Sequence, residues 1–141
     1  MNSNSNEYKE LASLAISARE KSYCPYSRFA VGAALLTDSG KIYTGANIEN
    51  SSYTPTVCAE RVAVFTAVHA GERSFKAIAI AGGPLGEDPV NPIPPCGVCR
   101  QVLTEFAGGD LKIILAVKDG YEEYTLDSLM PLSFDRSSLG K

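Results

Sequence analysis

Two short cysteine-containing motifs constrain this chain of 141 residues more than any other feature of its sequence. Residues 56–61 read Thr-Val-Cys-Ala-Glu-Arg, and residues 95–101 read Pro-Cys-Gly-Val-Cys-Arg-Gln. In the second motif Cys96 and Cys99 are three residues apart, so one face of a helical turn can present both thiols to a single metal ion. If the first motif supplies a third ligand, the fold must bring two distant segments to one point.

Cys58 and Glu60 in the first motif require a helix that begins at Cys58. Inside a regular helix, residues two apart point about 200° away from each other, so they would not face the same ion. Residues 58–70 are nearly all good helix formers or small apolar residues, and Gly71 ends the pattern. The segment is apolar almost all round, which predicts a buried helix. His69, the only histidine, lies about 16 Å along this helix from Cys58, too far to share its metal ion.

Hydrophobic periodicity outside the motifs predicts an α/β fold. Recurrent apolar residues predict a helix over 7–21 that stops before Pro25. Strands are predicted at 29–36, 41–45, 75–81, 111–117 and 121–125, and further helices at 96–107 and 126–130. The strand–helix–strand unit 75–117 calls for a right-handed parallel crossover. We therefore expect a three-layer α/β/α architecture with a mixed five-stranded sheet.

Two stretches are expected to lie at the rim of a site. The connection 82–95 contains five prolines and two adjacent glycines, and loops of this length are often functional. Asn47 and Glu49 follow the second predicted strand and alternate, so both can project toward one ligand. In the first predicted strand, Gly32 and the neighbouring alanines leave room for close approach of another group.

Composition limits the class of protein. With 45% apolar residues, the chain is expected to form a single domain, 1–141, with polar tails at 1–6 and 135–141. The net charge of −3 argues against nucleic acid as a partner, and no apolar run approaches the ~18 residues of a membrane span. The first six residues lack the apolar core of a secretory signal, so a cytoplasmic protein is expected. In that setting the four cysteines favour metal or catalytic use over disulfides.

Charge balance is the main requirement of a zinc site built from Cys58, Cys96 and Cys99. Three thiolates and a divalent ion sum to a net charge of about −1. The predicted helix N-termini at both motifs favour negative charge. Arg61 and Arg100 adjoin the ligands, and both are expected to donate hydrogen bonds to thiolate sulfur.

The number of ligands separates a structural from a catalytic zinc site. Closed structural sites have four protein ligands, whereas catalytic sites have three and a water. Cys24 is the only further thiol, so a closed four-cysteine site is the alternative. With an open position, zinc would lower the pKa of its water, and Glu60 is expected to take that proton as a general acid/base.

These motifs and their order are similar to those of cytidine deaminases, small homotetrameric enzymes, in the variant with a three-cysteine zinc site. The likeness spans residues 8–134 and includes residues 25–35, 47–50, 58–61 and 95–101. It implies one zinc ion per chain on the three cysteines, a proton-shuttle role for Glu60, and hydrogen bonds from Arg61 to the thiolates. It also implies hydrolysis of cytidine and 2′-deoxycytidine to uridine and 2′-deoxyuridine with release of ammonia, a reaction of pyrimidine salvage.

The same resemblance implies a binding site for a nucleoside. Phe29 would pack on the pyrimidine ring, and Asn47 and Glu49 would hydrogen-bond the ribose hydroxyls. The backbone around Ala59 would meet the base. A neighbouring subunit of a homotetramer would contribute Phe134 to the pocket.

Three alternatives stay open at this point. A deaminase of a cytosine-containing antibiotic such as blasticidin S would share the zinc motif, although Phe29, Arg61 and the ribose-binding pair favour cytidine. A non-enzymatic zinc-stabilised binding module would use Cys24 as its fourth ligand. Action on a polynucleotide is disfavoured by the acidic balance of the chain, and Glu49 beside the sugar would repel phosphate.

Overall fold

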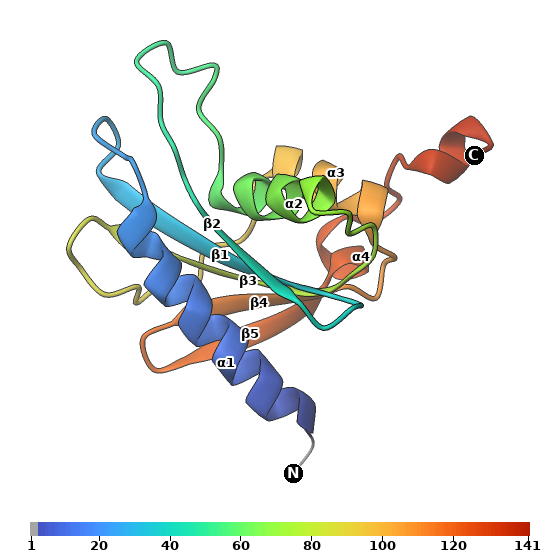
Figure 1. The fold of residues 1–141 in the computed structure, drawn as a ribbon, viewed down its shortest axis with the longest axis horizontal. Coiled ribbons are helices and arrows are strands. Elements are labelled where there is room, and N and C mark those ends of the chain that lie inside the picture. The colour runs from blue at the N-terminus through green and yellow to red at the C-terminus, as the bar shows by residue number, and fades with distance from the viewer. Residues whose placement is uncertain (1–2) are drawn as a thin grey trace.

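A mixed five-stranded sheet lies at the centre of the molecule (Figure 1). A computed structural model describes residues 3–141. The strands are β1 (Phe29–Thr37), β2 (Ile42–Ala46), β3 (Phe75–Pro84), β4 (Lys112–Val117) and β5 (Gly120–Thr125), and their spatial order is β2-β1-β3-β4-β5. β3 and β4 are parallel, with Ile78 opposite Ile113, and the other neighbouring strands are antiparallel. The predicted mixed sheet with one parallel strand pair is confirmed.

Helices cover both faces of the sheet, which gives the predicted three-layer arrangement (Figure 1). They are α1 (Ser3–Ala18), η1 (Arg19–Lys21), α2 (Ala59–His69), α3 (Gly97–Phe106), α4 (Leu126–Leu129) and η2 (Arg136–Leu139). α1 packs on one face, against strand residues such as Leu36 and Ile114. α2 and α3 pack on the other face, against Leu35 and Ile113. Both faces of the central strands are therefore buried, as their continuous apolar sequences predicted.

Two elements extend beyond their predicted bounds by three residues or more, whereas most other boundaries shift by about one residue. α1 begins at Ser3, so residues 3–6 of the predicted polar tail are helical, while residues 1–2 lie outside the described range. Periodicity missed this turn because a polar first turn carries no apolar stripe. β3 runs through Pro84 into the predicted loop, because its antiparallel pairing with β1 continues as far as Phe29.

α2 is less buried than its sequence predicted. Its inner residues Ala59, Ala63 and Val64 are fully buried, but Phe65 is 50% exposed. The prediction of burial all round is wrong because only one side of α2 packs on the body of this chain. His69 at the end of the helix is exposed, which agrees with its exclusion from the predicted metal site.

Gly45 in β2 allows α2 to lie very close to the sheet. A Cβ atom at this position would be 2.6 Å from the Ala59 oxygen and 2.6 Å from the Ala63 nitrogen, which is too close for any side chain. Gly32 in β1 has the same role beneath the first helix, where such a Cβ would be 2.7 Å from the Arg19 nitrogen. The close approach predicted for the first strand is confirmed, and Gly45 fixes the position of the first turn of α2.

Two segments project from the body of the molecule (Figure 1). Residues 47–58, between β2 and α2, rise above one end of the sheet, and residues 131–141 form a C-terminal arm that ends in η2. Asp135 caps η2 by accepting a hydrogen bond from the Ser137 amide, so the predicted polar tail 135–141 is partly helical. None of the helices within residues 3–141 is long and apolar enough to cross a membrane.

Candidate metal centre and adjoining cavity

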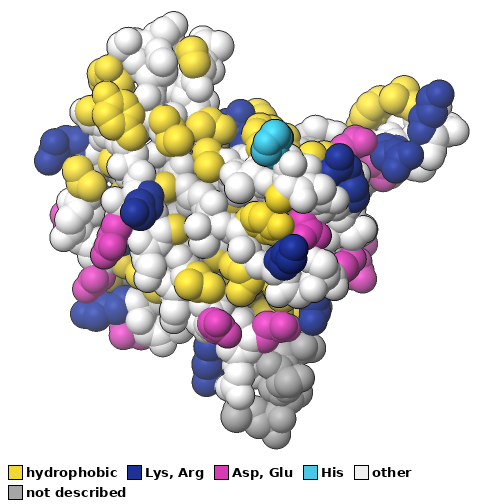
Figure 2. Space-filling model, viewed as in Figure 1, with side chains coloured by type: hydrophobic (Ala, Val, Ile, Leu, Met, Phe, Trp, Pro, Cys, Tyr) yellow, Lys and Arg dark blue, Asp and Glu magenta, His cyan; other side chains and the backbone are white. Residues whose placement is uncertain are grey.

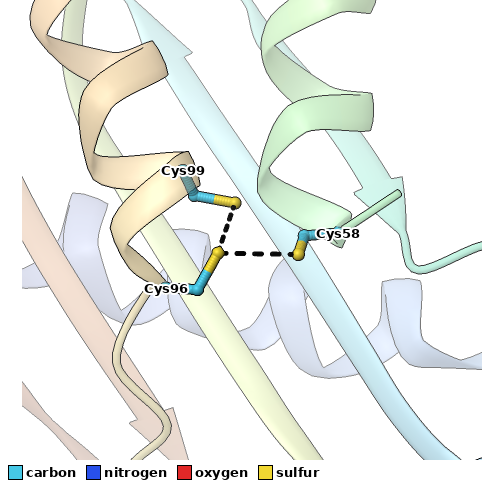
Figure 3. A group of neighbouring side chains, drawn as sticks. All are labelled: Cys58, Cys96 and Cys99. Atoms are coloured by element: carbon cyan, nitrogen blue, oxygen red, sulfur yellow. Dashed lines mark hydrogen bonds between the residues drawn. The ribbon is translucent and has the colours of Figure 1, made fainter. Parts of the chain in front are cut away.

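Three cysteine side chains from two helix starts point toward one another (Figure 3). Cys58 is the N-cap of α2 and Cys96 is the N-cap of α3, and both have extended backbone angles. Cys99 lies in the first turn of α3. The Sγ atoms of Cys58 and Cys96 are 3.8 Å apart, and those of Cys96 and Cys99 are 3.6 Å apart. The helix start required at Cys58 and the convergence of the three thiols are confirmed.

The spacing of the three sulfurs fits a shared zinc ion. Sulfurs bound to tetrahedral zinc at about 2.3 Å lie about 3.8 Å apart, whereas a disulfide brings them to about 2.0 Å. Within residues 3–141, the side chains able to hold a metal ion together are Cys58, Cys96 and Cys99. Cys24 is buried elsewhere, with its Sγ 3.2 Å from the Ser22 hydroxyl. The closed four-cysteine alternative is therefore not supported.

The charges around Cys58 favour a thiolate. The Cys99 thiol and the Arg61 guanidinium lower the pKa of Cys58 to about 5, and Arg61 donates from Nη2 to Cys58 Sγ at 3.4 Å. The neighbouring Cys58 thiolate in turn raises the pKa of Cys99. Three thiols this close do not all ionise without a cation to offset their charge. Arg61 Nε is buried and has no hydrogen-bond partner among residues 3–141, so the guanidinium keeps a further donor beside the sulfurs.

Arg100 does not donate to sulfur, so that prediction is wrong. Its Nε donates to the Pro95 carbonyl at 2.8 Å, and its Nη1 donates to the Leu129 carbonyl at 2.6 Å. These two carbonyls belong to the turn before Cys96 and to the end of α4, and they accept from two of the five N–H donors of the guanidinium. Arg100 therefore fixes the backbone next to a metal ligand instead of balancing the charge of the thiolates.

Glu60 and two of the thiols open into one cavity of about 210 Å³. The residues that line it are Val31, Asn47, Thr56, Val57, Cys58, Ala59, Glu60, Ile93, Pro94 and Cys96. Glu60 occupies the first turn of α2 and is only 5% exposed. Burial, together with the negative charge of Cys58, raises the pKa of Glu60 to about 7. A carboxyl with this pKa can both take up and release a proton near neutral pH.

Asn47 lines the same cavity but is already bonded to β1. Its Nδ2 donates to the Phe29 carbonyl at 2.8 Å, and its Oδ1 accepts from the Val31 amide at 2.9 Å. A carboxamide has two N–H donors and two lone pairs on its oxygen. One donor and one acceptor of Asn47 are therefore still available to a ligand, and β1 holds them in a fixed orientation.

Glu49 lies in a neighbouring cavity of about 380 Å³ that shares Thr56 with the first. Its Oε1 accepts from the amides of Tyr26 and Ser27, both at 3.0 Å, and its Oε2 accepts from the Ser27 hydroxyl. The bonds from Ser27 hold the pKa of Glu49 below its usual range. Asn47 and Glu49 thus line two separate cavities that have Thr56 in common, and Glu49 carries a negative charge.

Besides Glu49, two of the predicted substrate residues do not line the Glu60 cavity in the single chain. The cavity lining includes Val31 but not Phe29. Val31 lies two residues after Phe29, on the same face of β1. Phe134 is 60% exposed on the C-terminal arm, where its carbonyl accepts from Gln101 Nε2 at 2.8 Å. Ala59, in contrast, is fully buried and lines the cavity.

Sequence analysis did not single out five of the lining residues. They are Val31, Thr56, Val57, Ile93 and Pro94. The only signal for four of them is position, because they stand one to three residues before a predicted metal ligand. The expectation that connection 82–95 lies at the rim of a site is met by Ile93 and Pro94.

A three-thiol metal centre at two helix starts, with a buried glutamate in the adjoining cavity, is the arrangement of a zinc hydrolase that works by proton transfer. The family described as the cytidine and deoxycytidylate deaminase zinc-binding region matches residues 5–115. The chain belongs to this family, and the resemblance read from its motifs is confirmed.

Similar proteins agree with the family. A cytidine deaminase of Sporosarcina psychrophila is 50% identical over 123 residues, which cover 86% of this chain and 87% of that protein. The crystal structure of a cytidine deaminase from Burkholderia pseudomallei aligns with a TM-score of 0.80 and 42% identity, covering 95% of this chain and 100% of that one. A blasticidin-S deaminase of Bacillus cereus is 30% identical over 110 residues, 76% of this chain and 78% of that protein.

Proposed function

We propose that this protein catalyses the hydrolytic deamination of cytidine and 2′-deoxycytidine to uridine and 2′-deoxyuridine, as a cytoplasmic enzyme of pyrimidine salvage. The observation that carries the proposal is the shared cavity of Glu60, Cys58 and Cys96, since deamination needs a metal-activated water and a proton carrier side by side. Relatives named cytidine deaminase, 50% identical in one case, support this substrate class. The chain, 1–141, acts as one domain.

The proposed chemistry divides between the ion and Glu60. Cys58, Cys96 and Cys99 would hold zinc, which when bound supplies the Lewis acidity that activates water near neutral pH. Glu60 takes a proton from that water and delivers it to ring nitrogen N3. It then takes the proton of the new hydroxyl group on C4 and carries it to the amino group on C4. The C4–O bond forms, the C4–N bond breaks, and ammonia leaves with Glu60 restored to its starting state.

The remaining residues bind and orient the nucleoside in this proposal. Asn47, with its spare donor and acceptor, and the charged Glu49 bond the ribose hydroxyls. Phe29 packs on the ring, and the Ala59 backbone meets the base. A carboxylate at Glu49 disfavours a phosphorylated sugar, so the free nucleoside is the preferred substrate. Arg61 keeps Cys58 as a thiolate through its hydrogen bond to Sγ.

Ultraviolet absorbance of purified, zinc-loaded protein tests the proposed function. We expect cytidine and 2′-deoxycytidine to be converted with release of ammonia. Cytidine 5′-monophosphate should react at least about tenfold more slowly, because one lost contact or one repulsion changes the rate by about that factor. Blasticidin S is the comparison substrate, since a deaminase of that antibiotic is among the similar proteins. Activity on blasticidin S without activity on cytidine would reverse the choice of substrate, and activity on neither would favour a binding module.

We further propose a homotetramer in which neighbouring subunits complete each pocket. Support comes from exposed apolar side chains on the two projecting segments, visible at the top left and right of Figure 2. These are Ile48 (46% exposed) and Tyr53 (70%) on the first, and Leu132 (105%), Phe134 (60%) and Leu139 (65%) on the C-terminal arm. Apolar groups exposed to this degree typically mark an interface. The arm would carry Phe134 to the pocket of another subunit.

The mass in solution tests this assembly. Light scattering after size-exclusion chromatography is expected to give about four times the chain mass of 15.0 kDa. Phe134→Ala is expected to raise KM for cytidine severalfold and to leave the zinc content unchanged, because Phe134 is not part of the metal-binding group of Cys58, Cys96 and Cys99. Leu85→Ala, at a side chain that is 47% exposed on another loop, is the matched control. An active monomer whose KM is insensitive to Phe134→Ala would refute the shared pocket.

A further inference from the structure

Ile93 enters the cavity from a strongly constrained segment. Pro92 and Pro94 flank it, and a residue before proline is confined to extended backbone. Pro89 and Pro95, on either side of the segment, are fully buried. The Lys118 amide also donates to the Pro89 carbonyl at 2.7 Å. The backbone of Ile93 is therefore restricted before any ligand binds.

Ile93 is part of an apolar wall built over Gly82 of β3. A Cβ atom at Gly82 would lie 3.1 Å from Ile93 Cγ1, 3.1 Å from Phe29 Cε2 and 3.3 Å from Val31 Cγ2. The three side chains therefore converge over Gly82, where β3 has no side chain to separate them. Val31 and Ile93 also line the cavity that contains Glu60 and the thiols. The wall thus continues from the surface of the sheet to the metal centre.

The chemistry of deamination fixes which edge of the ring faces which side of this cavity. C4 must face the thiols, and N3 must face Glu60, which comes from α2 together with Cys58. C5 is bonded to C4 on the side away from N3, so it faces the other helix start, that of α3. The segment directly before Cys96 at that start contains Ile93 and Pro94, and both line the cavity. Ile93 offers the branched apolar group suited to a C–H edge.

We propose that Ile93 is a specificity-determining residue that lies against C5 of the pyrimidine ring and selects against substituents there. The inference rests on the proposed function, because the orientation of the ring follows from deamination at C4. Since the proline-rich segment restricts the backbone of Ile93, a methyl group at C5 meets a branched side chain whose backbone cannot shift freely. Cytidines with hydrogen at C5 are therefore preferred over 5-methylcytidines.

Deamination of cytidine and 5-methylcytidine by wild type, Ile93→Val and Ile93→Ala tests the assignment. The wild type is expected to favour cytidine in kcat/KM by at least about tenfold, the effect of one carbon in a fitted pocket. The ratio of kcat/KM for 5-methylcytidine to that for cytidine should rise in Ile93→Val and rise further, about tenfold or more, in Ile93→Ala. Val90→Ala, at a side chain on the same loop that is 66% exposed, is the matched control and should leave the ratio unchanged.

The outcomes separate this inference from the proposed function. Wild type that does not deaminate cytidine overturns the proposed function and the role of Ile93 with it. Wild type that deaminates cytidine, with variants that lose activity on both substrates equally, shows that Ile93 only supports the fold and overturns the inference alone. Thermal unfolding of each variant shows whether that variant is folded. The milder Ile93→Val variant provides a second test of specificity if Ile93→Ala is misfolded.

Discussion

Replacing Glu60 by glutamine is expected to lower kcat for cytidine by about a thousandfold or more while the protein keeps one zinc ion per chain. General acid/base groups contribute about 10²–10⁴-fold in typical enzymes, and Glu60 is proposed to move a proton at two steps. Glutamine has nearly the same shape but cannot take up or deliver a proton. Because Glu60 is only 5% exposed, bulk water cannot readily replace it as the proton carrier.

The measurement pairs turnover with metal content. Absorbance of cytidine gives kcat and KM, and inductively coupled plasma mass spectrometry gives zinc per chain for the same sample. Glu105→Gln, an exposed glutamate on α3, is the matched control and should change neither value. A Glu60→Gln variant with near wild-type kcat would refute the proton-shuttle role. Loss of zinc in that variant would instead assign Glu60 to the stability of the metal centre.

The two helix starts are the part of the site that sequence reasoning could predict. Cys58 and Glu60 face one centre only if a helix begins at Cys58, and the good helix formers that follow supply it. Spacing in the second motif likewise placed Cys96 and Cys99 on one turn. These predictions depend on residues close together in the chain. Local helix geometry was therefore sufficient to predict this part of the site.

Contacts between distant segments could not be predicted in this way. Arg100 adjoins a metal ligand in the sequence, but its donors reach the Leu129 carbonyl, a partner set by the packing of α4 beside α3. Asn47 was predicted to face a ligand, but the geometry that orients it depends on its two bonds to β1. The entry of Ile93 into the cavity depends on the loop fixed at Pro89. In each case the partner belongs to another helix, strand or loop. The spacing of residues in the sequence therefore does not predict the contact.

Replacing Cys99 by serine is expected to abolish stable zinc binding and to lower the thermal midpoint by about 10 °C. Cys99 is fully buried and its sulfur is 3.6 Å from Cys96 Sγ, so its removal leaves only two thiols at the centre. A ligand present at 1,000 times its Kd stabilises a fold by about 4 kcal/mol. Each kcal/mol shifts the midpoint by roughly 2–4 °C for a domain somewhat larger than this one. Zinc ties the start of α2 to the start of α3, so its loss frees both.

A chelator separates the contribution of zinc from the cost of a buried serine. In the wild type, a strong zinc chelator should lower the midpoint by about the same 10 °C, because it removes the same linkage. In Cys99→Ser the chelator should have no effect, whatever the midpoint of that variant, since a packing cost does not respond to chelation. Cys24→Ser is the matched control, because Cys24 lies outside the metal-binding group and its variant should keep both zinc and the response to chelator. A Cys99→Ser protein that retains one zinc and still responds to chelator would show that the ion is bound elsewhere.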